Sequence, residues 1–330
     1  MADRRPPPHG WIVLDKTRGL GSTQAVSAVK RVLREGGYAK TKVGHGGTLD
    51  PLAEGVLPIA LGEATKLAGR MLNASKIYEF TIKFGEETDT LDSEGEVVER
   101  SDHVPHYADV EEVMHSFEGE IEQVPPAYSA IKIDGKRAYD LARAGEAVEL
   151  KTRTVTVHTL ILRHPGAGRD PEPRSAAQCS LGPGLRRGDH KVEEITLTAH
   201  VSKGTYIRSL ARDIARALGT CGHVTYLRRT KAGPFSEIQA ISLDKLHKQA
   251  NGAAFEDLLL PLEAGLDDIP ALPLSQTDAQ AVRAGRVVSG LPQASGLYCA
   301  MFDSVPVALV EISDGTAKVV RGFNLPDVAE

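Results

Sequence analysis

The sequence predicts a mixed α/β protein, and three kinds of pattern support that fold class. Residues 154–162 and 195–201 alternate apolar with polar side chains, which is typical of half-buried strands. Residues 207–218 carry apolar side chains at the spacing of one helix face, and Gly219 then ends the segment. Beyond residue 275, short strand-like segments follow one another with turns between them. Helices and strands therefore share the chain, and its last part is β-rich.

The N-terminal half adds further elements in chain order. Residues 11–14 form a short apolar run, and apolar residues then recur at helical spacing behind Ser22, a residue type that caps helices. Residues 77–84 have an extended pattern, and the Gly- and Asp-bearing segment 85–96 predicts a loop or hairpin. Residues 109–118 predict a short acidic helix.

Two segments indicate how the chain is divided. Residues 164–190 are rich in Gly, Pro and Arg and have almost no large apolar side chains, so we expect a disordered surface insertion between two paired strands. The proline-rich segment 261–275 indicates a domain boundary. We therefore expect a main domain over residues 1–260 and a smaller β domain over residues 261–330.

Composition bounds the class of protein. The 330 residues are 41% hydrophobic and 25% charged, as in ordinary globular proteins. The N-terminus lacks the apolar run of a signal peptide, and no stretch of about 18 apolar residues predicts a membrane span. Three widely spaced cysteines suit a reducing compartment and give no zinc-ligand spacing. We expect a cytoplasmic protein without structural zinc.

Charge is unevenly distributed along the chain, although the net charge is −5. Residues 84–125 hold fourteen Asp and Glu against a single Arg, whereas residues 200–234 hold seven Lys and Arg against a single Asp. Such segregation can give one face an attraction for phosphates while the whole protein stays acidic. Chance clustering of solvated charge is the alternative.

The chemistry-bearing candidate is Asp50, which lies in the segment VGHGGTLDPLAEGVLP at residues 43–58. Glycines and prolines surround it, and Pro51 restricts Asp50 away from the helical region, which partly directs the side chain. Local physics leaves two possibilities open, a functional carboxylate or a carboxylate that caps a turn. The segment contains no nucleotide-phosphate motif, and His45 has no second histidine at metal-ligand spacing.

Residues 44–66, GHGGTLDPLAEGVLPIALGEATK, resemble the catalytic motif of the TruB family, bacterial pseudouridine synthases that modify uridine 55 in the T loop of transfer RNA. Further segments resemble the family in the same order, namely residues 10–16, 88–95, 125–143, 202–215 and 226–235. The resemblance implies a sheet rich in antiparallel strands with flanking helices and a small C-terminal PUA-like β-barrel domain that binds RNA.

The resemblance also implies roles for single residues. Asp50 corresponds to the nucleophile, Tyr78 to the tyrosine that stacks on the flipped base, and Arg208 to the arginine that pairs with the nucleophile. Leu227 corresponds to the apolar wall of the base pocket. From periodicity alone, Tyr78 would be a core residue and Arg208 a solvated one.

Other residues are implied in RNA binding or in support of the site. His45 and Lys16 match residues that bind RNA, and Lys203 and Tyr206 belong to the same SKGTYIR motif as Arg208. The expected substrate is the T arm of transfer RNA. The family's reaction needs no cofactor and no metal, and we expect a monomer without an obligatory protein partner or membrane contact.

Three other functions compete with this one. The same surface could serve a tRNA-folding chaperone, which would not need Asp50. A guide-dependent pseudouridine synthase would share the catalytic motif but act within a ribonucleoprotein. A hydrolase with an aspartate nucleophile is the least favoured, because no second carboxylate is linked to Asp50 as a general acid.

Overall fold

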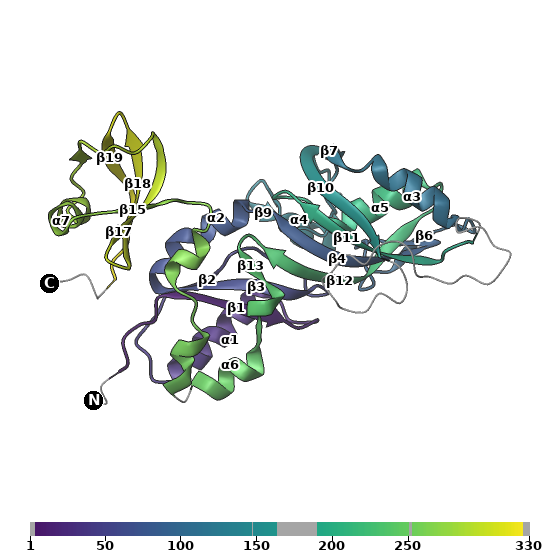
Figure 1. Cartoon of the computed structure of the whole chain (residues 1–330). Helices are drawn as coiled ribbons and strands as arrows, with labels where there is room; N and C mark the ends of the chain where they lie inside the picture. Colours follow the sequence, from purple (N-terminus) through teal and green to yellow (C-terminus); the bar gives the residue numbers. More distant parts are fainter. Residues whose placement is uncertain (1–3, 147, 164–189, 251–252, 326–330) are drawn as a thin grey trace, which may run out of the picture. The chain divides into compact units, whose positions relative to one another are not determined.

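The protein is described here by a computed structural model that covers residues 4–146, 148–163, 190–250 and 253–325 (Figure 1). The insertion expected at residues 164–190 therefore lies outside the described residues, apart from residue 190. The chain forms two compact units. Unit 1 comprises residues 1–50, 55–72 and 231–330, and unit 2 comprises residues 51–54 and 73–230. The chain leaves unit 1 directly after Asp50.

Unit 1 contains an antiparallel pair of strands at the centre of its sheet. Its strands are β1 (Gly10–Lys16), β2 (Val43–His45), β3 (Glu54–Leu61), β13 (Phe235–Ser236) and β14 (Ile241–Ser242). Strands β1 and β3 pair antiparallel with Trp11 opposite Ala60, β2 adds to β3, and β14 pairs parallel with β1. Its helices include α1 (Ser22–Glu35), α2 (Ala68–Asn73) and α6 (Leu243–Ala250).

Trp11 lies at the centre of the core of unit 1. It is fully buried, its ring lies 5.1 Å from the Phe235 ring, and its Nε1 donates to the Leu262 carbonyl at 3.0 Å. Short 3-10 turns lie in the connections, at Gly62–Leu67, Glu237–Gln239, Ala253–Leu258 and Leu262–Gly265. Leu262 and Leu266 share a core with Trp11. The division predicted at residue 260 stays a prediction.

Unit 2 is built on five strands in the order β12, β4, β11, β10, β7. These are β12 (Gly222–Ala232), β4 (Lys76–Phe84), β11 (Glu194–Val201), β10 (Arg153–Arg163) and β7 (Gly119–Gln123). Strands β10 and β11 pair antiparallel up to Arg163, opposite Thr196. The segment that joins them therefore connects two neighbouring strands, as predicted.

Two helices pack on this sheet. Helix α5 (Ile207–Ala217) packs against β4, and α3 (Tyr107–His115) packs against α5 and β10. The apolar stripe predicted for α5 is buried, which confirms that amphipathic pattern. The smaller elements are β5 (Glu86–Thr88) paired with β6 (Val97–Arg100), β8 (Lys132–Ile133) paired with β9 (Lys136–Arg137), and α4 (Ala138–Arg143).

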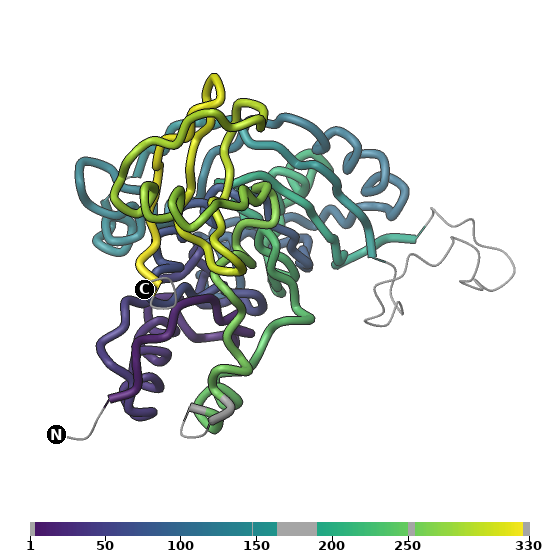
Figure 2. The backbone as a smooth tube through the Cα atoms, turned by 60° about the vertical axis from the view of Figure 1, so that its left-hand side comes forward, coloured from purple at the N-terminus to yellow at the C-terminus, as the bar shows by residue number. Residues whose placement is uncertain are grey.

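The C-terminal part of unit 1 contains a separate five-stranded sheet, drawn from yellow-green to yellow in Figure 2. Its strands are β15 (Ala271–Pro273), β16 (Val288–Ser289), β17 (Gly296–Phe302), β18 (Val305–Ser313) and β19 (Thr316–Gly322), and α7 (Gln276–Arg283) packs on it. The sheet curls into a half-barrel with its own apolar cluster. The predicted fold class, a mixed α/β chain with a PUA-like β module, is confirmed.

One local prediction was wrong, and one alternative that periodicity favoured is excluded. Ser22 does not cap α1, because Gly21 holds the cap position and the Ser22 hydroxyl bonds elsewhere. Arg208 is not solvated at the start of α5, because its side chain is only 5% exposed. No helix in the described part of the chain is long and apolar enough to cross a membrane.

Candidate active site

The Asp50 loop is held by close contacts within unit 1. The Ser22 hydroxyl accepts from the Leu49 N–H at 2.8 Å and donates to the Leu49 carbonyl at 2.9 Å, so it fixes the peptide groups that precede Asp50. Gly46 approaches Met71 so closely that an added Cβ would lie 2.7 Å from the Met71 Cβ. Asp50 itself is half-buried. The loop therefore presents this carboxylate from a constrained backbone.

Lys16 and His45 also belong to unit 1. Lys16 is fully buried, and its Nζ donates to the carbonyls of Leu20 at 2.7 Å and Thr17 at 3.2 Å. The His45 Nδ1 accepts from the Gly47 N–H at 3.3 Å. Lys16 thus braces the turn before α1, and the RNA-binding roles of both residues stay predictions.

Tyr78 and Leu227 belong to unit 2, on the neighbouring strands β4 and β12. Leu227 is buried, whereas Tyr78 is half-buried. The hydroxyl of Tyr78 lies 3.5 Å from Nη1 of Arg229, which is only 1% exposed. A buried guanidinium beside the phenol directs the tyrosine ring. Sequence patterns gave no reason to select Arg229 from its arginine-rich strand.

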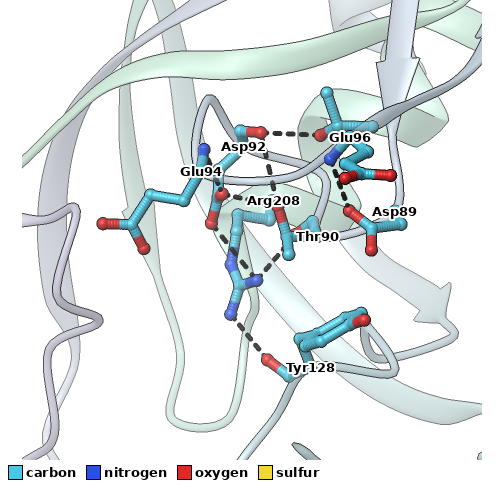
Figure 3. A network of polar contacts seen from close by, with 8 residues as sticks. Asp89, Thr90, Asp92, Glu94, Glu96, Tyr128 and Arg208 are labelled. Carbon is cyan, nitrogen blue, oxygen red and sulfur yellow. Dashed lines mark hydrogen bonds and ion pairs between the residues drawn. The ribbon is translucent and has the colours of Figure 1, made fainter. Parts of the chain in front are cut away.

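Arg208 is the centre of a buried polar network in unit 2 (Figure 3). Its Nη1 donates to the Thr90 carbonyl at 2.7 Å, and its Nη2 donates to the Tyr128 carbonyl at 2.9 Å. The same Nη1 lies 3.4 Å from the carboxylate of Asp92, whose side chain is 4% exposed. Arg208 is therefore fixed in direction by two carbonyls and one buried carboxylate.

Asp92 organises the loop that faces Arg208. Its Oδ1 accepts from the Thr90 hydroxyl at 2.6 Å and from the Glu94 N–H at 3.0 Å. Together with the Arg208 guanidinium, these donors give the carboxylate the polar partners that a buried charge needs. Asp92 lies within the TDTLDSEG segment, but the sequence did not single it out as a site residue.

Tyr206 and Lys203 lie in the loop directly before α5, the helix that carries Arg208. Tyr206 is the residue before α5. The buried amide of Gln123 holds its backbone from both sides, accepting from the Tyr206 N–H at 2.8 Å and donating to its carbonyl at 3.1 Å. Lys203 donates to Asn73 Oδ1 at 3.2 Å. Gln123 thereby fixes the start of the helix that carries Arg208.

Several bases of the cationic segment 200–234 form ion pairs within the protein. Besides Arg208, three arginines pair with carboxylates at 2.8, 2.9 and 3.4 Å, in the pairs Arg212–Asp213, Arg216–Glu87 and Arg228–Glu54. These three arginines are thus paired within the protein, and the attraction of one face for phosphates stays a prediction.

Lys76, which is 7% exposed, lies near two other cations, Arg229 and Lys203. Burial, followed by the positive charges of Arg229 and Lys203, lowers the pKa of Lys76 from 10.5 to about 8. Its Nζ donates to the Ala74 carbonyl at 2.6 Å. Three cations held near one another cost stability, and such an arrangement is typical of sites that bind anions.

We expect Lys76→Met to raise the free energy of unfolding by up to about 3 kcal/mol at pH 7. Because the folded-state pKa of about 8 is below the ordinary 10.5, the folded wild type carries a full penalty below pH 8 and loses it as the pH rises to 10.5. The gain from the substitution should therefore shrink toward zero at pH 10.5.

Urea unfolding of both proteins at pH 7 and at about pH 10 measures this difference. Lys83→Met, on the same strand and 47% exposed, is the matched control and should show no such gain. If Lys76→Met raised the free energy of unfolding equally at both pH values, the gain would not come from removing a buried positive charge.

The structure thus divides the predicted site residues between the units. Lys16, His45 and Asp50 lie in unit 1, and Tyr78, Lys203, Tyr206, Arg208 and Leu227 lie in unit 2. The predicted pairing of Arg208 with Asp50 stays a prediction. Among the described residues, no group of three or more His, Cys, Asp or Glu is placed to hold a metal ion.

Comparison with known proteins identifies the class. A family model described as TruB family pseudouridylate synthase, N-terminal domain, matches residues 34–207, and one described as tRNA pseudouridylate synthase B, C-terminal domain, matches residues 208–267. The chain is a pseudouridylate synthase, an isomerase. The tRNA pseudouridine synthase B of Novosphingobium aromaticivorans is 62% identical over 97% of this chain and 99% of its own length.

A second relative, the tRNA pseudouridine synthase B of Zymomonas mobilis, is 54% identical over 96% of each chain. The protein belongs to the TruB family. Among solved structures, an H/ACA ribonucleoprotein bound to a substrate RNA containing 2′-deoxyuridine has a chain that matches with a TM-score of 0.66 at 24% identity, over 97% of this chain and 86% of that one. That similarity concerns the fold alone.

Proposed function

We propose that this protein converts uridine 55 in the T loop of transfer RNA to pseudouridine, with Asp50 as the nucleophile. The observation that carries the proposal is the Asp50 loop, in which Ser22 clamps both peptide groups that flank Leu49, directly before the half-buried carboxylate. Relatives named tRNA pseudouridine synthase B cover nearly the whole chain, which supports transfer RNA as the substrate.

The reaction breaks the bond from N1 of uracil to C1′ of ribose, rotates the base, and joins C5 to C1′. N1 gains a proton and C5 loses one, so nothing is oxidised and no water is consumed. A single carboxylate can promote these steps by forming and breaking one covalent bond to the nucleotide. The proposal therefore includes neither a cofactor nor a metal.

The other predicted residues have roles that fit their surroundings. Tyr78 stacks on the flipped base, with its hydroxyl directed by Arg229. Leu227, on the neighbouring strand, forms the apolar wall. Arg208 supplies the charge that favours ionised Asp50, and it acts from a fixed position because carbonyls and Asp92 hold it.

The target uridine must leave the stacked T loop before the reaction can begin. A base stacked inside a T loop is extruded at a cost of a few kcal/mol, which contacts from the protein must offset. We assign such contacts to His45, Lys16, Lys203 and Tyr206 and to the PUA-like module, in a catalytic domain of residues 1–260 and an RNA-binding domain of residues 261–330. We propose a cytoplasmic monomer that needs no protein partner.

The direct test is incubation of the purified full-length protein with an unmodified tRNA transcript, followed by carbodiimide treatment and reverse transcription. We expect a stop at the T-loop uridine without added guide RNA or other proteins. No stop with correctly folded protein would overturn the proposal. A stop that required a guide RNA would favour the guide-dependent alternative.

A further inference from the structure

Arg153 is a partly buried arginine that the proposed mechanism does not use. It begins β10, directly opposite Gln123 of β7, and its guanidinium carbon lies 4.6 Å from the centre of the Tyr206 ring. Its Nε and Nη2 are buried and have no hydrogen-bond partner. Among the described residues, no carboxylate pairs with this side chain.

Unpaired donors of this kind require an explanation. A buried N–H group without an acceptor costs about 1–3 kcal/mol, and more when the group is charged. Nε and Nη2 lie on one edge of the guanidinium, the edge that binds two oxygens of one phosphate or carboxylate at the same time. The two unpaired atoms of Arg153 thus form a fork that is shaped for a bidentate anion.

The loop beside Arg153 fits the same ligand. Gly204 lies next to the guanidinium, since an added Cβ would be 3.8 Å from Arg153 Nη1. Lys203, the preceding residue, is exposed, and its Nζ donates to the neutral amide of Asn73. Gly204 permits the backbone of a ligand to approach closely, and the cations Arg153 and Lys203 favour a ligand with a negatively charged backbone.

The Tyr206 ring lies next to the Arg153 guanidinium, whose carbon is 4.6 Å from the centre of the ring. The amide of Gln123 holds the Tyr206 backbone through both its N–H and its carbonyl. Within the described part of the chain, by contrast, the Tyr206 hydroxyl makes no hydrogen bond. The ring can therefore turn away by side-chain rotation while the backbone, and with it the start of α5 and Arg208, stays in place.

We propose that Arg153 binds one phosphodiester of the substrate RNA through its Nε and Nη2, and that the Tyr206 ring moves off the guanidinium when it does so. This inference rests on the proposed function, because it requires an RNA substrate. It adds a phosphate-binding site beside the loop that precedes α5 and Arg208, and it assigns Gln123 the task of keeping that loop fixed while the ring moves.

The first experiment measures the affinity of full-length protein for a T-arm RNA hairpin as a function of NaCl concentration. Arg153→Gln should reduce the slope of log affinity against log salt by about 0.7–0.9, the value for one lost phosphate contact. Arg163→Gln is the matched control, because it removes the same charge from the other end of β10. It should leave the slope unchanged.

The second experiment locates the phosphate. Single methylphosphonates are placed along the hairpin, each removing the charge of one phosphodiester. At one position we expect binding by the wild type to weaken about tenfold, the effect of one charge-assisted pair, while Arg153→Gln is insensitive there. Arg153→Lys keeps a charge but lacks the fork, so it should keep the salt slope and show a smaller methylphosphonate effect than the wild type at that position.

The outcomes separate the two proposals. If the wild type modifies the T loop but Arg153→Gln retains the wild-type slope and methylphosphonate profile, Arg153 is a structural residue and only this inference fails. If the wild type neither binds nor modifies T-arm RNA, both fail. Urea unfolding of each variant shows whether a change in affinity follows from loss of folded protein.

Discussion

Asp50→Asn is expected to abolish pseudouridine formation, lowering the single-turnover rate by about 10³-fold or more, while leaving RNA affinity nearly unchanged. The amide has the size of the carboxylate but cannot form the covalent bond to the nucleotide. The loop should keep its shape, because Ser22 holds the backbone of Leu49 rather than the Asp50 side chain. Loss of activity would then report chemistry and not folding.

Glu54→Gln is the matched control for this substitution. Glu54 is the next carboxylate along the chain, and it pairs with Arg228 at 3.4 Å while being 29% exposed. The pair is partly buried and its carboxylate has no part in the proposed chemistry, so the variant should keep its rate within a few-fold. A pure RNA chaperone would retain its whole activity in Asp50→Asn, and a wild-type modification rate in that variant would remove Asp50 from the mechanism.

The regular helices and strands could be predicted from the sequence because their buried side chains recur at the spacing of a helix or a strand. The stripe on α5 and the alternation in β10 and β11 are local patterns, and each matches an element that buries one face. The pairing of β10 with β11 could also be predicted, because removing the insertion leaves two strands joined by a short turn. The spacing of the apolar side chains and the short connection between the strands were sufficient to predict these elements and their pairing.

The supports of the site could not be predicted in the same way. Periodicity treats Arg208 as a polar residue on an outer helix face, whereas carbonyls distant in sequence draw it into the interior. Ser22 was predicted as a helix cap because its type and position fit one, yet its hydroxyl binds Leu49 instead. Such contacts depend on segments that come together only in the folded chain.

The candidate site residues themselves came from the resemblance to a family and not from local physics. Asp50 alone allowed either a nucleophile or a turn cap, and Tyr78 alone fitted a core position. The buried cations Lys76 and Arg229 were not selected at all, because a lysine or arginine in an alternating strand predicts an exposed side chain. Only the fold reveals which charges it has buried.

Asp92→Asn is expected to be the most damaging change among the supporting residues. It removes the carboxylate that lies 3.4 Å from the buried Arg208 guanidinium, and breaking a buried pair in this way costs about 3–5 kcal/mol of stability. The Thr90 hydroxyl and the Glu94 N–H both donate to Oδ1, and the amide oxygen of asparagine in that place would still accept both bonds, so the loop should remain folded.

Activity should fall as well, by about 10²-fold, because a small displacement of a positioned group has effects of that size. Urea unfolding gives the stability, and single-turnover rates measured where both proteins are fully folded give the activity. Glu94→Gln is the control, since Glu94 is exposed and contributes its backbone N–H to Asp92. It should change neither quantity appreciably.

The double variant Asp92→Asn with Arg208→Gln separates the two roles of the pair. Removing both members of the pair leaves no buried guanidinium facing the lost carboxylate, so the double variant should be more stable than Asp92→Asn alone. It should nevertheless be no more active, because the charge that favours ionised Asp50 has gone. Recovery of activity together with stability would mean that the pair serves folding only, and that Arg208 has no part in the reaction.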